Sequence, residues 1–281
     1  MTAIDPGAAS APKPLFSESY KTSVLGLLVL AYTFNFIDRT IISTIGQAIK
    51  VDLGLTDTQL GLLGGLAFAL LYTTLGIPIA RLAERRNRVN IISIAIVIWS
   101  AFTALCGMAN SFLMLILFRL GVGVGEAGLS PPAHSLISDY YEPKRRATAL
   151  SIYSFGIPLG TMFGAVAGGW IAQNLSWRAA FVLVGLPGIL VAIALKLFVK
   201  EPPRGYSEQA PVVDTPMLEG EETVPPATIK PPSILAVAKR IFGRWSFFHM
   251  VAGITIASFA SYGTGQYQAA YFIRMFGLDL A

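Results

Sequence analysis

The sequence contains little charge, a single cysteine and two histidines. Only 13% of its 281 residues are charged, whereas about a quarter of the residues in soluble domains are. Cys106 alone excludes a disulfide within the chain. Neither histidine, His134 or His249, has companions at the spacing of metal ligands, so no metal site is predicted. The motifs G-x-S-x-G, H-E-x-x-H and the P-loop are absent, which argues against an enzyme and predicts no cofactor.

Hydrophobic residues dominate the sequence. They make up 54% of the chain, and the mean hydropathy is +0.61. This composition predicts an all-α, polytopic membrane protein. The net charge of +5 does not indicate a nucleic-acid partner, because the basic residues lie in short loops between apolar runs. Residues 1–21 lack the apolar region of a removable signal peptide.

Seven apolar runs are long enough to cross about 30 Å of hydrocarbon. Interruptions such as Pro131-Pro132 and Pro158 predict tilts or kinks. The predicted spans are 22–48, 57–80, 89–109, 112–139, 147–172, 178–200 and 245–274. The expected parts of the chain are an N-terminal segment at 1–21, a six-helix bundle at 22–200, a linker at 201–244 and one further helix within 245–281.

Lysine and arginine are concentrated on one side of these spans. With the N-terminus inside, most of them fall in cytoplasmic segments, including 81–88 and 144–146, whereas Lys50 and Arg178 fall on the other side. The positive-inside rule therefore predicts a multi-pass protein with a cytoplasmic N-terminus.

The linker differs in composition from the spans. Residues 201–231 are rich in proline and glutamate and predict a mobile cytoplasmic segment. Between 234 and 242, apolar residues recur at helical spacing opposite Lys239 and Arg240. This pattern favours a short helix on the inner membrane surface, and an extension of the seventh span is the alternative.

Arg119 and Glu126 lie inside a predicted span, where charges are costly unless they face a cavity, a partner or a transported ion. Seven residues apart on a helix, they project from one face, about 10 Å apart along its axis, which is too far for a direct pair. Gly121, Gly123 and Gly125 leave the backbone open to a neighbouring helix or a substrate. We predict functional roles for both charges, and a buried network that only fixes helix register is the alternative.

Several motifs resemble signatures of the major facilitator superfamily. Residues 80–89, A-R-L-A-E-R-R-N-R-V, resemble its loop signature G-x-L-x-D-R-x-G-R-R/K. Residues 119–125 follow its R-x-x-x-G-x-G pattern, and 176–181 resemble the W-R-x-x-F that opens its sixth helix. Residues 156–169 carry glycines at four-residue spacing, which lets helices cross closely. The loop departs from the signature at Ala80, Glu84, Asn87 and Val89.

Within that superfamily, three stretches resemble the Spinster branch. They are F-N-F-I-D-R at 34–39, the run from Gly123 to Tyr141, and K-E-P-P-R-G at 200–205. The resemblance implies a secondary transporter that works by alternating access between two six-helix halves. On this basis the missing C-terminal half would supply five further spans. Spinster proteins are associated with lysophospholipids and sphingosine phosphates, whose phosphate an arginine can hold bidentately.

The resemblance and the estimated depths together suggest a layered site. Asp38, Arg39 and Arg119 fall at nearly one level at 1.5 Å per residue, and Glu126 lies closer to the cytoplasm. We expect Arg39, Arg119 and Asn35 to bind substrate, and Glu126, with Asp38, to carry the proton. A buried carboxylate near arginine can exchange its proton when its surroundings change. Asp38 and Arg39 differ by about 100° on their helix, so one of them could be structural.

A second cluster of charges resembles the cytoplasmic gate of the superfamily. In that gate, Glu84 would cap a helix of the other half, and Arg88, beside Arg85, would pair with Asp139. The alternative is a set of solvated loop charges, each worth under about 1 kcal/mol.

The seventh span contains Tyr262, Gln266 and Tyr267 beside two glycines. These residues predict a substrate-facing cavity wall, and an aromatic packing stripe is the alternative.

We therefore expect a proton-coupled transporter of an amphipathic or lipid-like molecule in the inner (plasma) membrane of a prokaryote. The expected partners are this small substrate, protons, the lipid bilayer and the C-terminal half. The alternatives are an organic-anion or drug transporter of the same superfamily, and a membrane scaffold or receptor that transports nothing.

Overall fold

The computed structural model describes residues 15–208 and 239–278, except for the side chains of 66–70. These residues form helices and connecting turns, with no strand among them, which confirms the predicted all-α class. The helices are α1 Glu18–Thr44, α2 Gly46–Leu53, α3 Asp57–Gly64, α4 Leu66–Arg85, α5 Arg88–Cys106, α6 Phe112–Glu126, α7 Ser130–Tyr140, α8 Pro143–Ser154, α9 Gly156–Asn174, α10 Trp177–Phe198, η1 Tyr206–Glu208 and α12 Trp245–Phe276.

Five stretches of the described chain are long and apolar enough to cross a membrane. They are α1, α5, the pair α6 and α7, the pair α8 and α9, and α10. The predicted spans at 57–80 and 245–274 are also helical, as α3 with α4 and as α12, but they do not belong to this set. The chain breaks between α3 and α4 at Gly65, and α12 carries a polar stretch at 261–268.

Two helix boundaries differ from the ends of the predicted segments. α1 begins at Glu18, before the predicted span at 22–48, and Ser17 caps it by accepting a hydrogen bond from the backbone N–H of Tyr20. The predicted loop at 80–89 is mostly helical, because α4 continues to Arg85 and Asn87 caps the start of α5. Short polar N-cap residues fix where a helix begins more sharply than apolar periodicity alone reveals.

The predicted interruptions at proline are helix breaks. Pro131 and Pro132 lie in the first turn of α7, which is separated from α6 by the three residues 127–129, and Pro158 lies in the first turn of α9, after a break at Phe155. Proline is tolerated there because the first backbone N–H groups of a helix have no partner within it.

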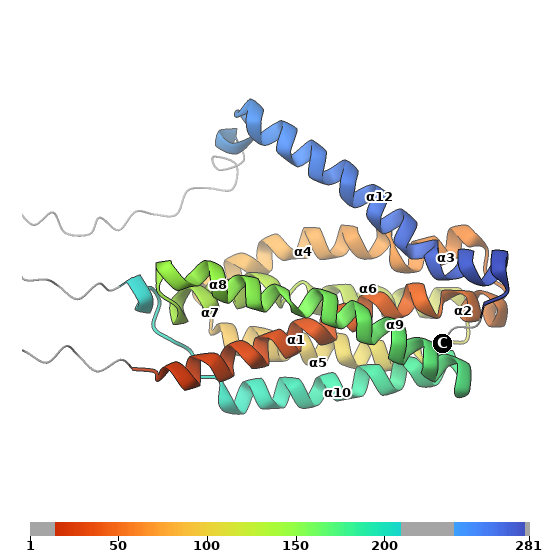
Figure 1. Ribbon diagram of the computed structural model, residues 1–281, viewed down its shortest axis with the longest axis horizontal. Coiled ribbons are helices and arrows are strands. Elements are labelled where there is room, and N and C mark those ends of the chain that lie inside the picture. Colours follow the sequence, from red (N-terminus) through yellow and green to blue (C-terminus); the bar gives the residue numbers. More distant parts are fainter. Residues whose placement is uncertain (1–14, 209–238, 279–281) are drawn as a thin grey trace, which may run out of the picture.

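Helix α9 packs closely against α1. Gly156, Gly160, Gly164 and Gly168 of α9 all face α1, where an added Cβ would lie within 3.1 Å of its atoms. The four-residue glycine spacing therefore serves a close helix crossing, as predicted. Elsewhere in the bundle, α10 packs along α5 and α5 along α6 (Figure 1).

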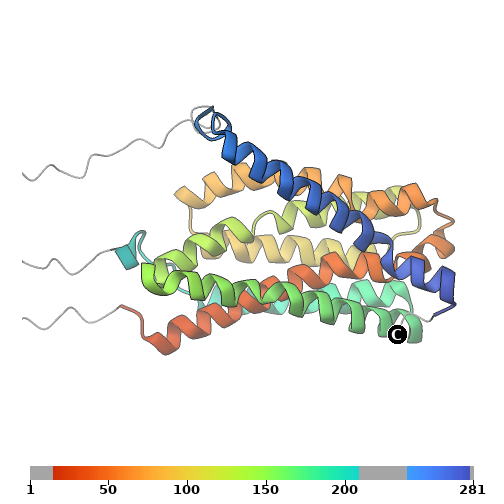
Figure 2. The ribbon, with the colours of Figure 1, turned by 45° about the horizontal axis from the view of Figure 1, so that its top comes forward.

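The bundle has two distinct ends. We call the end with the α4–α5 turn, the start of α8 and the end of α10 the basic end, and the end with α2 and α3 the opposite end. At the opposite end, Arg178 donates to Asp52 at 2.7 Å, and this hydrogen bond lowers the pKa of the exposed carboxyl group. The start of α12 lies away from the bundle, whereas its end lies against α2 and α3 (Figures 1 and 2).

The first part of the predicted linker is attached to the bundle. The backbone N–H of Gly205 donates to Asp139 at 3.0 Å, and Ser207 donates to the carbonyl of Ser138 at 2.6 Å. The rest of the predicted mobile segment, from residue 209, lies outside the described residues, as does 234–238 of the predicted surface helix. Residues 239–242 are helical and are separated from α12 by a break at Gly243 and Arg244.

Candidate functional site

A buried ion pair joins α1 to α6. The Nε of Arg39 donates to Oε2 of Glu126 at 2.6 Å, and the glutamate is fully buried. The guanidinium of Arg39 also lies over the ring of Tyr72, 4.5 Å from its centroid. The aromatic face stabilises a cation that has lost its water. The sequence predicts Arg39 and Glu126 at different depths in the membrane. The arginine side chain is long enough to cross that difference and reach the glutamate.

Arg119 connects α6 to two other helices. Its Nη1 donates to the backbone carbonyl of Asp38 in α1 at 3.3 Å, and its Nε donates to the carbonyl of Leu63 in α3 at 3.4 Å. The residue is only 2% exposed. Its charge is therefore stabilised inside the bundle, by these carbonyl dipoles and by the nearby carboxyl groups of Asp38 and Glu126, rather than by bulk water.

Three further polar side chains are buried beside the two arginines. They are Asn35 and Asp38 of α1 and Glu126 of α6. Asn35 lies close to Glu126, and Thr103 of α5 lies close to Asp38. Charged and amide groups gathered inside an apolar bundle are typical of substrate and ion pathways.

The arginines reach a cavity of about 650 Å³ between α1, α6, α9 and α12. Arg39 and Arg119 both line it, whereas Asp38, Asn35 and Glu126 lie behind its wall. Of the two neighbours Asp38 and Arg39, the arginine thus faces the cavity. The wall also includes the apolar Phe36 and Phe272 and the polar side chains of Thr40, Ser43, Thr44, Thr161, Ser261 and Gln268.

The polar stretch of α12 divides between the cavity and α3. Tyr262 and Gln266 line the cavity, and the Nε2 of Gln266 also donates to the carbonyl of Leu60 at 3.2 Å. Tyr267 does not line it; its hydroxyl donates to the carbonyl of Asp57 at 2.8 Å. Of the three residues expected to bind substrate here, Tyr267 instead attaches α12 to the opposite end.

A second charged cluster lies at the basic end. Arg88 is fully buried and donates to Asp139 at 2.5 Å, to Glu201 at 2.6 Å and to Ser135 at 2.8 Å. The structure thus brings together the pair Arg88 and Asp139 that the sequence suggested, and their role in gating remains a prediction. Arg88 is not one of a set of solvated loop charges.

The other two predicted gate residues lie apart from this cluster. Glu84 and Arg85 are exposed, and neither forms an ion pair within the described ranges. They are located in the last turn of α4 rather than in a loop. A position in the motif at 80–89 therefore does not by itself indicate which charged residues join the ion-pair network around Arg88.

Sequence reasoning missed the contribution of residues 201–204. Both carboxylate oxygens of Glu201 accept from Arg88, and Arg204 donates to the carbonyls of Ala83 and Arg86 at the end of α4. The resemblance of K-E-P-P-R-G at 200–205 to the Spinster branch is a signal for these contacts. The polar composition of 201–231 instead predicts a mobile linker. The described residues contain no group of three histidine, cysteine, aspartate or glutamate side chains that could hold a metal ion.

Comparison with known families and solved structures gives a consistent match. The sequence model described as Major Facilitator Superfamily matches residues 28–281. A crystal structure of a bacterial homolog of the human lysosomal transporter Spinster, in an inward-facing and unoccupied conformation, has a TM-score of 0.76. It is 40% identical in sequence, and the match covers 94% of this chain and 58% of that one.

Two curated relatives have other names. An MFS-type efflux pump of Mycolicibacterium smegmatis is 31% identical over 92% of this chain and 56% of its own length. A hexuronate transporter of Bacillus subtilis is 30% identical over 81% of this chain and 54% of its own length. The chain therefore spans about half the length of these relatives, all of which are named as transport proteins.

Proposed function

Because the chain belongs to the Major Facilitator Superfamily, we propose that it forms the N-terminal part of a proton-coupled secondary transporter for an amphipathic or lipid-like molecule. The transporter works by alternating access, with its site between this bundle and a second one that begins with α12. Protons and the bilayer are its other partners. The basic end faces the cytoplasm, which the concentration of lysine and arginine there supports.

The observation that carries the proposal is the buried pair of Arg39 and Glu126 at the cavity wall. A carboxylate that is fully buried is stable when a cation neutralises it or when it binds a proton. A substrate anion that attracts Arg39 would weaken its pair with Glu126. Proton binding by Glu126 and substrate binding by Arg39 therefore favour each other. This mutual dependence couples movement of the proton to movement of the substrate.

The cavity wall supports an amphipathic cargo. Arg39 and Arg119 offer planar guanidinium groups to a phosphate or carboxylate, and Phe36 and Phe272 offer apolar surface to a chain. The similarity to a bacterial Spinster homolog supports a lipid-like molecule. Lysophospholipids combine both features and are the first class to test.

The coupling role can be tested by replacing Glu126 with glutamine in the transporter that contains this chain. Glutamine has nearly the same shape but cannot bind or release a proton. In proteoliposomes, E126Q should reduce uptake of lysophosphatidylglycerol driven by a pH gradient to the level of protein-free vesicles. Exchange of labelled for unlabelled substrate without a gradient should continue.

Glu142 provides the matched control, because it is an exposed glutamate before α8. E142Q should leave both fluxes unchanged. Uptake by E126Q that still responds to the pH gradient as the unmodified protein does would overturn the coupling role. Loss of exchange as well as uptake would instead indicate damage to the binding site.

A second candidate is a transporter of hydrophilic organic anions. Hydroxyl and amide side chains, among them Thr40, Ser43, Thr161 and Gln268, form part of the cavity wall and suit a hexuronate-like solute. The similarity to a hexuronate transporter supports this alternative. Competition distinguishes the two: glucuronate should not inhibit lysophosphatidylglycerol uptake if the lipid-like cargo is correct. An efflux substrate such as ethidium can be compared in the same assay.

A further inference from the structure

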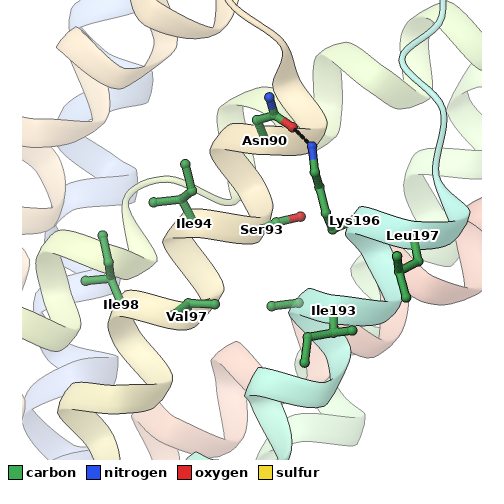
Figure 3. Close-up of a pocket in the computed structure, with 9 residues that line it drawn as sticks. Asn90, Ser93, Ile94, Val97, Ile98, Ile193, Lys196 and Leu197 are labelled. Carbon is green, nitrogen blue, oxygen red and sulfur yellow. Dashed lines mark hydrogen bonds between the residues drawn. The ribbon is translucent and has the colours of Figure 1, made fainter.

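A groove separate from the central cavity runs between α5 and α10. It has a volume of about 500 Å³ and opens on the outside of the bundle, between two helices that can each cross a membrane (Figure 3). Along α5 it extends from Asn90 to Ile98, which is about 12 Å at the helical rise. Its apolar wall consists of Ile94, Val97, Ile98, Ala192, Ile193 and Leu197.

One end of the groove is charged. Lys196 of α10 and Asn90 of α5 lie at the basic end, and the lysine Nζ donates to the asparagine Oδ1 (Figure 3). The asparagine is a neutral partner, and Lys196 forms no ion pair with the residues that the structure describes. An ammonium group at the mouth of an apolar groove is complementary to a molecule with an anionic head and a hydrocarbon tail.

Between the charged mouth and the apolar wall lies an unpaired hydroxyl group. Ser93 is 7% exposed and lines the groove, and its Oγ has no hydrogen-bond partner in the described part of the chain. In Figure 3 it lies on the side of α5 that faces α10. A buried hydroxyl without a partner points to a ligand that supplies one.

We propose that this groove binds one anionic phospholipid from the leaflet at the basic end. Its phosphate contacts Lys196, an ester carbonyl accepts a hydrogen bond from Ser93, and one acyl chain covers Ile94, Val97 and Ile193. The order of these groups along the groove matches the order of head, glycerol and chain in a phospholipid. The site requires only that the bundle lies in a membrane and is independent of what the central cavity transports.

Lipid retention tests the site. The purified transporter containing this chain is equilibrated in mixed micelles with equal amounts of phosphatidylglycerol and phosphatidylcholine, and retained lipids are counted by native mass spectrometry. The unmodified protein should retain phosphatidylglycerol selectively. K196Q should reduce its retention roughly fivefold, since one lysine near anionic lipid contributes about that factor. I193W, which fills the groove, should abolish it.

Matched variants separate this groove from other sites. K144Q removes an exposed lysine from the same end, outside the groove, and should change retention little. S93A should reduce retention about threefold, as expected for one hydrogen bond. The proposal is overturned by equal retention of the two lipids, by equal effects of K196Q and K144Q, or by loss of the lipid in R119A but not in K196Q.

Discussion

At the level of single residues, Gly160 shows how tightly α9 lies against α1. An added Cβ would come within 2.4 Å of the carbonyl oxygen of Thr33 and 2.5 Å of the Cβ of Phe36. The carbonyl oxygen of Thr33 is a backbone atom, so it can move away only if α1 itself moves. We expect Gly160→Ala to lower the free energy of unfolding by about 1–3 kcal/mol, as overpacking does, which chemical denaturation in detergent micelles would measure.

Gly26 on α1 is the matched control, because a Cβ there would meet nothing within 4 Å. Alanine also favours a helix interior over glycine, by up to about 1 kcal/mol. Gly26→Ala should therefore be neutral or stabilising. Equal destabilisation by both substitutions would mean that the α1–α9 contact is not the cause.

The two arginines of the cavity show why residue type alone does not define a role. Arg39 pairs with a carboxylate, whereas Arg119 donates to two backbone carbonyls. Both are charges within an apolar helix, and the sequence singled out both for that reason. Their different partners come from α6, α1 and α3, which are distant in the chain.

At the level of secondary-structure elements, Arg88 connects α5, α7 and the segment that follows α10. Its removal would leave Asp139 and Glu201 close together without their shared cation. We expect Arg88→Ala to lower the free energy of unfolding by about 3–5 kcal/mol, as for other broken buried pairs. The midpoint of thermal unfolding in detergent would report the change.

Arg85 is the control for this effect, since it is an exposed arginine three residues earlier in the chain. Arg85→Ala should change the free energy of unfolding by less than about 0.5 kcal/mol. Similar losses for the two variants would contradict a special role of the buried cluster. If Arg88 also acts in gating, Arg88→Ala should in addition change the transport rate per folded protein.

The segment 200–208 illustrates how a polar sequence becomes ordered. Its backbone and side chains bond to α4, α5 and α7, and Phe16 packs edge-on against both Tyr140 and Tyr206. The aromatic contacts exclude water from one side of the segment, which favours its hydrogen bonds to the bundle. The polar composition of the segment predicts mobility. It does not reveal these partners, because they lie more than 60 residues away in the chain.

At the level of the molecule, the two ends of the bundle differ in charge, and we expect the basic end in the cytoplasm. Cysteines introduced at Lys144, at the basic end, and at Asn110, between α5 and α6 at the other end, test this in a Cys106→Ser background. Both positions are exposed. A membrane-impermeant maleimide should label N110C in intact bacterial cells and K144C only after permeabilisation. The reverse pattern would invert the proposed orientation.

Much of the fold followed from the sequence. Membrane helices are predictable because apolar length and lysine–arginine bias are local, additive properties. The boundaries at Ser17 and Asn87 were missed because capping depends on a few hydrogen bonds rather than on periodicity. The break at Gly65 in the second predicted span was missed because a glycine pair is equally compatible with a continuous, tightly packed helix.

For the candidate site, the sequence was sufficient to indicate which charges matter, because an arginine or a glutamate in an apolar run requires compensation wherever it lies. It did not indicate the partners. Arg39 and Glu126 are 87 residues apart, and Arg88 and Glu201 are 113 apart. Such pairs depend on how helices cross and how far flexible side chains reach. The close α1–α9 crossing and the attachment of residues 200–208 are properties of the assembled bundle, because hydrogen bonds and ion pairs act over a few ångströms in space and not along the chain.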